Sequence, residues 1–334
     1  MKTFSTLLAL SLAITTATVS LPSTAQTPAP ITASDDQLIK QTLRQIGLAT
    51  PVRTITPTGI GELLMVTLTT GESLLITPDA RYVINATAEP NPSTIHAIDP
   101  AIMSDKPTGT PIDEDHKIAL LANMNALPLV TPDTVFFHTS IKGLLWAVAQ
   151  NGTPFLVSAD ARYVIGGDIS VIANGKLGGL DTAFETAKNR HTLATLDHTS
   201  LTIYPAKDER AVVYVATDIN CPYCKILHKN IPNLTAKGIT VKVIGYPVYD
   251  ESPEPMRQIW CERDNAKRAK LLDLAMKGVK AGNQCGNDDN HLSSNIAKVR
   301  PLAIIATPAV YGENGELFEG NVANDELVKF LMAK

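Results

Sequence analysis

Apolar positions near the start of the chain first follow a helix and then strands. Leu38, Ile39, Leu43 and Ile46 have the spacing of an amphipathic helix that ends at Gly47. Ser34 and Gln37 before and within it have the spacing of a capping box. Three strand-like runs follow, at Glu62 to Leu68, Ser73 to Ile76 and Arg81 to Ile84. The pattern predicts an α+β unit.

The same pattern returns 81 residues later. Asp79-Ala80-Arg81-Tyr82-Val83-Ile84 is identical to Asp160-Ala161-Arg162-Tyr163-Val164-Ile165. At this offset the alignment also matches Thr50-Pro51 with Thr131-Pro132, Ile60 with Ile141, Leu64 with Leu145, Gly71 with Gly152, and Leu75 with Leu156. A match over such a span predicts an internal duplication.

The duplication and the positions of turn-forming residues suggest how the chain divides into domains. We expect a first copy over 26–105, a second over 106–178, a linker helix within 179–195 and a last domain over 196–334. Asp181 is the expected N-cap of that linker helix, Thr182 to Arg190. Neither copy contains a cysteine and their histidines are scattered, so a scaffold, dimerisation or binding role is expected for both.

The last domain carries a Cys-x-x-Cys motif between a strand and a helix. Ala211 to Ala216 is an apolar, β-branched run, and the apolar positions after the motif recur at helical spacing, although Pro232 argues for a kink or break. Cys221 then falls at or beside the helix N-cap, where free N–H groups and the helix dipole favour a thiolate. The thiolate attacks in disulfide exchange. Cys224, one turn later, is placed to resolve a mixed disulfide.

The alternatives for this motif are an inert structural disulfide and half of a zinc site. A four-cysteine zinc site usually joins two short Cys-x-x-Cys pairs, whereas the other cysteines here, Cys261 and Cys285, lie far apart. We therefore expect no metal and no cofactor. Four cysteines permit three pairings, and in an exported protein Cys261 most plausibly pairs with Cys285.

Composition and the first residues indicate an exported protein. Met1 to Ala25 has the positive start, the short apolar run and the small residues of a secretory signal cleaved near Ala25; a membrane anchor is the alternative. The formal net charge of −4 argues against a nucleic-acid partner. Export would place the cysteines in an oxidising compartment.

Five segments of the last domain together resemble one family. They are Cys221 to His228, Ile239 to Pro247, Ile259-Trp260-Cys261, Cys285, and Thr307-Pro308-Ala309-Val310. They are similar to the thioredoxin-fold catalytic domain of the bacterial periplasmic DsbC/DsbG disulfide isomerases. The repeated units resemble that family's N-terminal dimerisation domain, which implies tandem cystatin-like repeats before an α/β thioredoxin-fold domain with a helical insertion.

The resemblance assigns roles to particular residues. It implies that Cys221 is the nucleophile and Cys224 the resolving cysteine, and that Cys261 and Cys285 form a structural disulfide. Substrate contacts are implied for four residues: Pro222, Tyr223, Thr307 and Pro308, with a cis peptide before Pro308. The family also implies misfolded or oxidised exported proteins as clients, a DsbD-type inner-membrane reductase as electron donor, and a possible homodimer.

Two departures leave parts of this hypothesis open. The dipeptide Pro222-Tyr223 is that of the DsbG branch, whereas the second cysteine pair is typical of the DsbC branch, so redox potential and preferred substrate stay open. The duplicated unit permits either a monomer, in which the two copies pair, or a larger dimer.

The leading hypothesis is a periplasmic thiol:disulfide isomerase. A reductase of sulfenylated cysteines or a dithiol oxidase would use the same residues, and a holdase chaperone would rely on the duplicated domains instead. His228 is expected to be a solvated helix-face residue rather than a modulator of the thiolate. Asp218 is expected to cap a turn or to influence proton transfer, and Trp260 to pack in the core.

Overall fold

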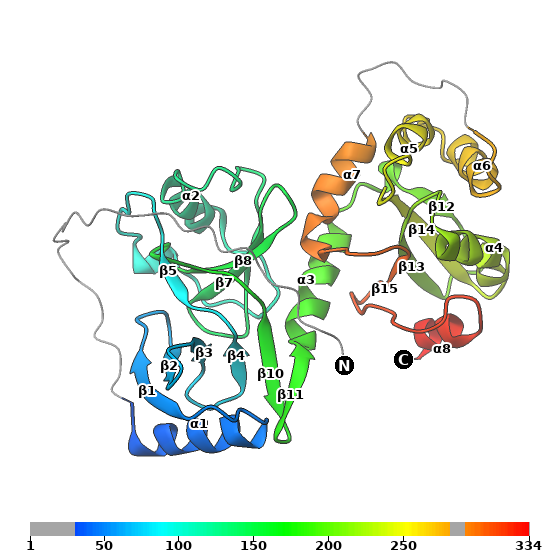
Figure 1. The fold of residues 1–334 in the computed structure, drawn as a ribbon. Coiled ribbons are helices and arrows are strands. Elements are labelled where there is room, and N and C mark those ends of the chain that lie inside the picture. The colour runs from blue at the N-terminus through cyan, green and yellow to red at the C-terminus, as the bar shows by residue number, and fades with distance from the viewer. Residues whose placement is uncertain (1–30, 281–290, 334) are drawn as a thin grey trace.

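Two lobes lie on either side of one helix (Figure 1). The structure, a computed structural model, describes residues 31–280 and 291–333. The predicted signal segment and Cys285 lie outside the described residues. Across the described part of the chain, no helix is long and apolar enough to cross a membrane.

The N-terminal lobe contains two antiparallel sheets. The six-stranded sheet has the order β1-β2-β3-β4-β10-β11 and the five-stranded sheet the order β5-β9-β8-β7-β6. The strands of the first are β1 (Val52–Pro57), β2 (Leu64–Leu68), β3 (Ser73–Ile76), β4 (Tyr82–Ile84), β10 (Ile169–Ala173) and β11 (Lys176–Leu180). Those of the second are β5 (Ala88–Pro90), β9 (Tyr163–Ile165), β8 (Pro154–Ser158), β7 (Leu144–Val148) and β6 (Phe136–His138). Each sheet therefore draws strands from both halves of the lobe.

Two helices cover this lobe. They are α1 (Ala33–Gln45) and α2 (Glu114–Ala122), with the short 3-10 helix η1 (Pro100–Ile102) between them. The predicted first helix is present, but its cap is not the predicted one. Thr32, rather than Ser34, is the N-cap, and it exchanges hydrogen bonds with Asp35 in a capping box. Both pairs have the same three-residue spacing, so the sequence pattern alone does not separate them.

Helix α3 (Thr182–Ala194) joins the lobes, and it begins at the predicted N-cap, Asp181. Phe184 near its start belongs to the apolar core of the N-terminal lobe, whereas Leu193 near its end belongs to that of the C-terminal lobe. Between them, the side-chain amide of Asn189 donates to the carbonyl oxygen of Gly315, 3.2 Å away. The helix is therefore packed against both lobes.

The C-terminal lobe is built on a four-stranded mixed sheet of order β12-β14-β13-β15. Its strands are β12 (Thr202–Tyr204), β14 (Ile239–Gly245), β13 (Ala211–Thr217) and β15 (Ala309–Gly312), and only β13 and β14 run parallel. Its helices are α4 (Pro222–Ala236), α5 (Pro253–Trp260), α6 (Asn265–Met276), α7 (His291–Val299) and α8 (Glu326–Met332), with 3-10 helices η2 (His198–Ser200) and η3 (Arg300–Leu302). Beyond these strands, Tyr311 and Leu317 form an isolated antiparallel bridge.

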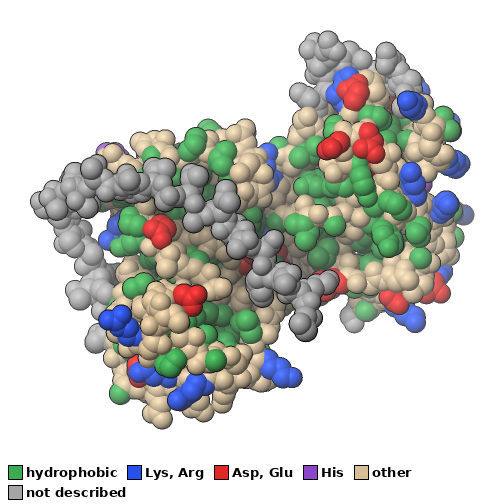
Figure 2. Space-filling view, in the orientation of Figure 1, with side chains coloured by type: hydrophobic (Ala, Val, Ile, Leu, Met, Phe, Trp, Pro, Cys, Tyr) green, Lys and Arg blue, Asp and Glu red, His purple; other side chains and the backbone are tan. Residues whose placement is uncertain are grey.

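Strand β13 separates two apolar cores. Because side chains alternate along a strand, Val213 and Val215 face the core beneath α4, whereas Val212 and Tyr214 face the core beneath η3. Figure 2 shows hydrophobic side chains gathered on the viewed face of this lobe and Lys and Arg along its outer side.

Pro232, where the sequence predicted a kink or a break, does not end α4. The helix continues through it to Ala236. Proline lacks the N–H that a helix interior uses and costs about 3 kcal/mol there. Leu227, Ile231 and Leu234 are all buried against the sheet, and their burial offsets that cost.

Candidate active site

The turn between β13 and α4 places Cys221 at the start of a helix. Cys221 is the N-cap of α4, in an extended backbone conformation, and Pro222 is the first helical residue. The main-chain N–H of Cys224 donates to the Sγ atom of Cys221, across 3.4 Å. A sulfur at this position takes the place of the oxygen that usually caps a helix, so it faces a free main-chain N–H at the positive end of the helix dipole.

Both cysteines of the motif are free thiols and both are buried. The thiol of Cys221 donates to the carbonyl oxygen of Thr307, 3.1 Å away, and the N–H of Asp218 lies 3.5 Å from the Sγ of Cys224. The structure thus brings three predicted site residues together, namely the two cysteines and Thr307. The Thr307–Pro308 peptide bond is cis, as expected.

The Cys224 thiol is held in its neutral form. Burial raises the pKa of Cys224 to about 12, and the N–H of Asp218 opposes this rise only in part. Charge is disfavoured where water is absent. Both sulfurs lie in the same buried cluster, and they differ in that Cys221 caps α4 whereas Cys224 lies inside its first turn.

The carboxylate of Asp218 ties the turn before Cys221 to the segment after β14. One oxygen accepts from the N–H groups of Val248, at 2.6 Å, and Tyr249, at 3.1 Å. The other accepts from the N–H of Asn220 at 2.7 Å and the hydroxyl of Ser252 at 2.6 Å. Asp218 is fully buried. The predicted turn interaction is present, but no sequence pattern pointed to Val248, Tyr249 or Ser252 as partners.

Exposed apolar side chains occur on the three segments that meet at the cysteines. The exposed fractions are 66% for Tyr223, 43% for Val248, 42% for Tyr249 and 98% for Ile305. Tyr223 lies within the motif, Val248 and Tyr249 are held by Asp218, and Ile305 is two residues before Thr307. Of these, sequence reasoning had singled out Tyr223 alone.

His228 is not the solvated residue that we expected. Its Nε2 atom lies 2.8 Å from a carboxylate oxygen of Asp273, and its ring contacts the ring of Tyr204 edge-on. Burial lowers the pKa of His228, while Asp273 opposes that shift. The partner comes from α6, which the helical spacing of α4 does not reveal. His228 is thus paired away from the cysteines.

The second cysteine pair is described in part. Cys261 is buried and disulfide-bonded. Cys285 lies outside the described residues, so their pairing stays a prediction. Trp260 beside Cys261 is completely buried, which confirms its predicted place in the core.

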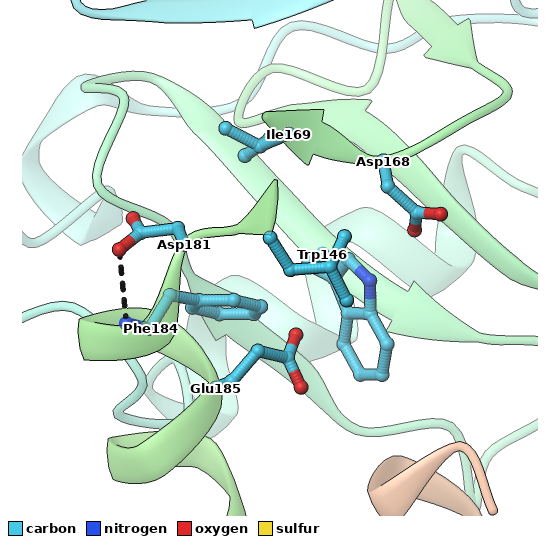
Figure 3. Close-up of a pocket in the computed structure, with 7 residues that line it drawn as sticks. Trp146, Asp168, Ile169, Asp181, Phe184 and Glu185 are labelled. Atoms are coloured by element: carbon cyan, nitrogen blue, oxygen red, sulfur yellow. Dashed lines mark hydrogen bonds between the residues drawn. The ribbon is translucent and has the colours of Figure 1, made fainter. Parts of the chain in front are cut away.

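A small pocket lies elsewhere, where α3 leaves the N-terminal lobe (Figure 3). Phe184 and Glu185 of α3 and Trp146 of β7 line it, and the N–H of Phe184 donates to Asp181. The ammonium of Lys188 contacts two of these residues, since it lies 2.8 Å from Glu185 and 4.2 Å from the centre of the Trp146 ring. None of the pocket's lining residues belongs to the C-terminal lobe. Over the described ranges, no cluster of His, Cys, Asp and Glu is arranged to hold a metal ion.

Comparison with known proteins connects the C-terminal lobe to one family description. A thioredoxin-like domain matches residues 198–333. Among solved structures, the disulfide interchange protein of Neisseria gonorrhoeae is 20% identical, with a TM-score of 0.36; the match covers 41% of this chain and 96% of that one.

Curated relatives extend the match into the N-terminal lobe. The thiol:disulfide interchange protein DsbC of Dickeya dadantii is 30% identical over 223 residues, which cover 64% of this chain and 86% of that protein. DsbC of Pasteurella multocida is 28% identical over 196 residues, covering 57% and 81%. DsbC of Escherichia coli K12 is 28% identical over 190 residues, covering 55% and 75%. The chain belongs to the DsbC family of thiol:disulfide interchange proteins and is a thiol:disulfide isomerase or oxidoreductase.

Proposed function

We propose that this protein rearranges incorrect disulfide bonds in exported proteins, with Cys221 as the nucleophile and Cys224 as the resolving thiol. The Cys221 thiolate attacks one sulfur of a client disulfide. A bond forms between its Sγ and that client sulfur, the client disulfide breaks, and the other client sulfur leaves as a thiolate that takes up a proton.

Two routes release the client. In isomerisation, a second client thiolate attacks the client sulfur of the mixed disulfide, so that a new client disulfide forms and Cys221 leaves as a thiolate with no net change in oxidation. In reduction, Cys224 attacks the Sγ of Cys221, which leaves the client reduced and a Cys221–Cys224 disulfide in the protein. That disulfide then needs electrons from a dithiol reductase.

The placement of the two thiols is the observation that carries the proposal: Cys221 caps α4 and contacts the Thr307 carbonyl, whereas burial raises the pKa of Cys224. Only a thiolate attacks, and burial disfavours the thiolate form of Cys224. The reductive route is slow as a result, and the mixed disulfide persists long enough for client thiols to attack it. This order of rates favours isomerisation over net reduction or oxidation.

The exposed apolar side chains around the motif support an unfolded polypeptide as substrate. Ile305 exposes 98% of its surface although it neighbours the Thr307 segment that contacts Cys221. Covering a side chain of this type is worth about 1.5–3 kcal/mol. A misfolded client, which exposes apolar residues near its cysteines, provides that cover, and Pro222, Tyr223, Thr307 and Pro308 complete the contact surface.

The cellular setting is part of the same proposal. We place the protein in the periplasm after removal of residues 1–25, with Cys261 and Cys285 as a structural disulfide and a DsbD-type inner-membrane reductase as electron donor. The duplicated N-terminal units, each with a cystatin-like fold, act as the scaffold for the thioredoxin-like domain.

Reactivation of scrambled ribonuclease tests the proposal. The wild-type protein is expected to restore ribonuclease activity catalytically. Cys221→Ser should fall to the uncatalysed rate, whereas Cys224→Ser should retain part of the activity because client thiols still release the mixed disulfide. Lys229→Ala, on the exposed face of the same helix, is the control. Full activity of Cys221→Ser would overturn the proposal.

A further inference from the structure

The last strand of each half of the N-terminal lobe lies in the sheet of the other half. Strand β5 ends the first half and pairs with β9 of the second. Strand β10, which lies 81 residues after β5, pairs with β4 of the first half. We define repeat 1 as residues 50–90 and repeat 2 as residues 131–171, the range over which the 81-residue offset holds.

The two exchanged pairings have the same register. Ala88 lies opposite Ile165 in one sheet, and their counterparts at the offset, Ile169 and Ile84, lie opposite each other in the other sheet. The next two pairs also correspond: Glu89 with Val164 and Ser170 with Val83, then Pro90 with Tyr163 and Val171 with Tyr82. Such reciprocity defines a two-fold interface, in which each partner offers the same surface.

The apolar core between the repeats has the same symmetry. One buried cluster contains both members of four equivalent pairs: Ile60 and Ile141, Leu63 and Leu144, Leu75 and Leu156, Ile84 and Ile165. Together with the reciprocal strand register, this shared cluster means that equivalent side chains of the two repeats face each other. The repeats are therefore packed about a local two-fold axis rather than in tandem.

Two equivalent turns touch at this axis. In the first turn the hydroxyl of Thr58 accepts from the N–H of Ile60 at 3.0 Å. In the second the hydroxyl of Thr139 accepts from the N–H of Ile141 at 3.1 Å. A Cβ atom on Gly61 would lie 1.9 Å from the carbonyl oxygen of Lys142, and one on Gly143 would lie 3.0 Å from the Cα of Gly61. The backbones are close enough that only glycine fits at both places.

We infer that the two repeats are each other's partner, so that one chain contains the complete two-fold scaffold and works as a monomer with a single Cys221–Cys224 pair. The exchanged strands and the shared core are satisfied within the chain, so this surface is not free for a second copy. The symmetry ends after β10, since only repeat 2 continues into β11 and α3. One thioredoxin-like domain therefore serves two scaffold units, which is the monomeric arrangement of the two that the duplication permits.

A cut between the repeats tests this inference on the folded protein. Lys106 and Pro107 are exposed, so a protease site inserted between them leaves the sheets intact. Light scattering is expected to give the mass of one chain over a wide range of concentration, before and after the cut, because each sheet holds strands from both fragments. A mass of two chains, or separation of the fragments after the cut, would overturn the inference.

Two proline variants distinguish loss of the pairing between β10 and β4 from a general loss of stability. Ser170→Pro removes an N–H from β10, which pairs with β4 of repeat 1, whereas Lys176→Pro changes the outer strand β11. After the cut, Ser170→Pro should release free fragments and Lys176→Pro should not. Equal release by both variants would contradict the reciprocal pairing. Cysteine activity plays no part in these measurements, so failure here leaves the isomerase proposal intact.

Discussion

The thiol of Cys221 donates a hydrogen bond to the carbonyl oxygen of Thr307, 3.1 Å away and 86 residues later in the chain. The same sulfur accepts from the N–H of Cys224 at 3.4 Å. The first contact requires a proton on sulfur, whereas the second also suits a thiolate. In the proposed mechanism, ionisation of Cys221 would break its bond to the Thr307 segment and free that carbonyl for a client backbone N–H.

The order of thiol reactivity should follow the two environments. Alkylation needs a thiolate, and burial raises the pKa of Cys224 to about 12. We expect iodoacetamide to label Cys224 about tenfold faster for each pH unit up to that value. Site-resolved mass spectrometry measures the rates. A Cys224 rate that levels off near neutral pH would contradict the neutral, buried thiol.

The same raised pKa sets the sign of one contribution to stability. Because the folded protein holds the proton on Cys224 more tightly, this contribution is present below the ordinary value of 9.0 and is lost as pH rises toward about 12. Cys224→Ala should therefore lose less stability than the wild type over that range. Urea unfolding of the reduced proteins gives the comparison, and parallel curves would refute it.

Removing the charge of Asp218 should loosen the segment after β14. Asp218→Asn keeps the shape of the side chain but replaces one carboxylate oxygen with an NH₂ group. That group faces N–H donors which in the wild type bind the carboxylate, so the free energy of unfolding should fall by about 3 kcal/mol. The expected result is a lower midpoint of urea unfolding together with faster hydrogen exchange at Val248 and Tyr249. Asp250→Asn, a change at an exposed residue nearby, should alter neither. Unchanged exchange in Asp218→Asn would rule out the bracing role.

The histidine in α4 should make the C-terminal lobe sensitive to acid. Burial and, to a smaller extent, Lys277 lower the pKa of His228, while Asp273 opposes the shift. Its contribution to stability is thus present above 6.5 and lost as pH falls through the lowered value. Between about pH 7.5 and about pH 5, His228→Phe should lose less stability than the wild type. Equal losses in denaturant titrations would show that His228 does not contribute.

Ile305 should affect client binding more than chemistry. Ile305→Ser removes apolar surface that is 98% exposed, so folding stability should hardly change. Loss of about 1 kcal/mol of client contact raises KM about fivefold with little change in kcat. The control is Ile118→Ser on α2, where the side chain is also exposed. Equal KM values for both variants would remove Ile305 from the client surface.

Local patterns predicted the elements better than their partners. The strand Ser73 to Ile76 and the N-cap Asp181 were predicted correctly, because alternation and capping depend on neighbouring residues. The identity of the motif and its place at a helix start were likewise readable from Cys221 and its flanking apolar runs. The cap of α1 was ambiguous because two residue pairs share one spacing.

Contacts between distant segments were not predictable in this way. The partner of His228 lies 45 residues away, and the partners of Asp218 lie beyond another strand. The exchange of β5 and β10 was also hidden, since both copies have the same pattern whether each sheet closes on itself or on its neighbour. Packing around the shared core decides between these arrangements, and no single segment carries that information.

Trapping of the mixed disulfide is the measurement that tests the chemistry most directly. A Cys224→Ser variant incubated with scrambled ribonuclease should accumulate a covalent complex, and peptide mapping without reductant should find the client joined to Cys221. The complex should disappear on addition of dithiothreitol and should not form with Cys221→Ser. A client joined to another residue, or no complex at all, would contradict the assignment of Cys221 as the nucleophile.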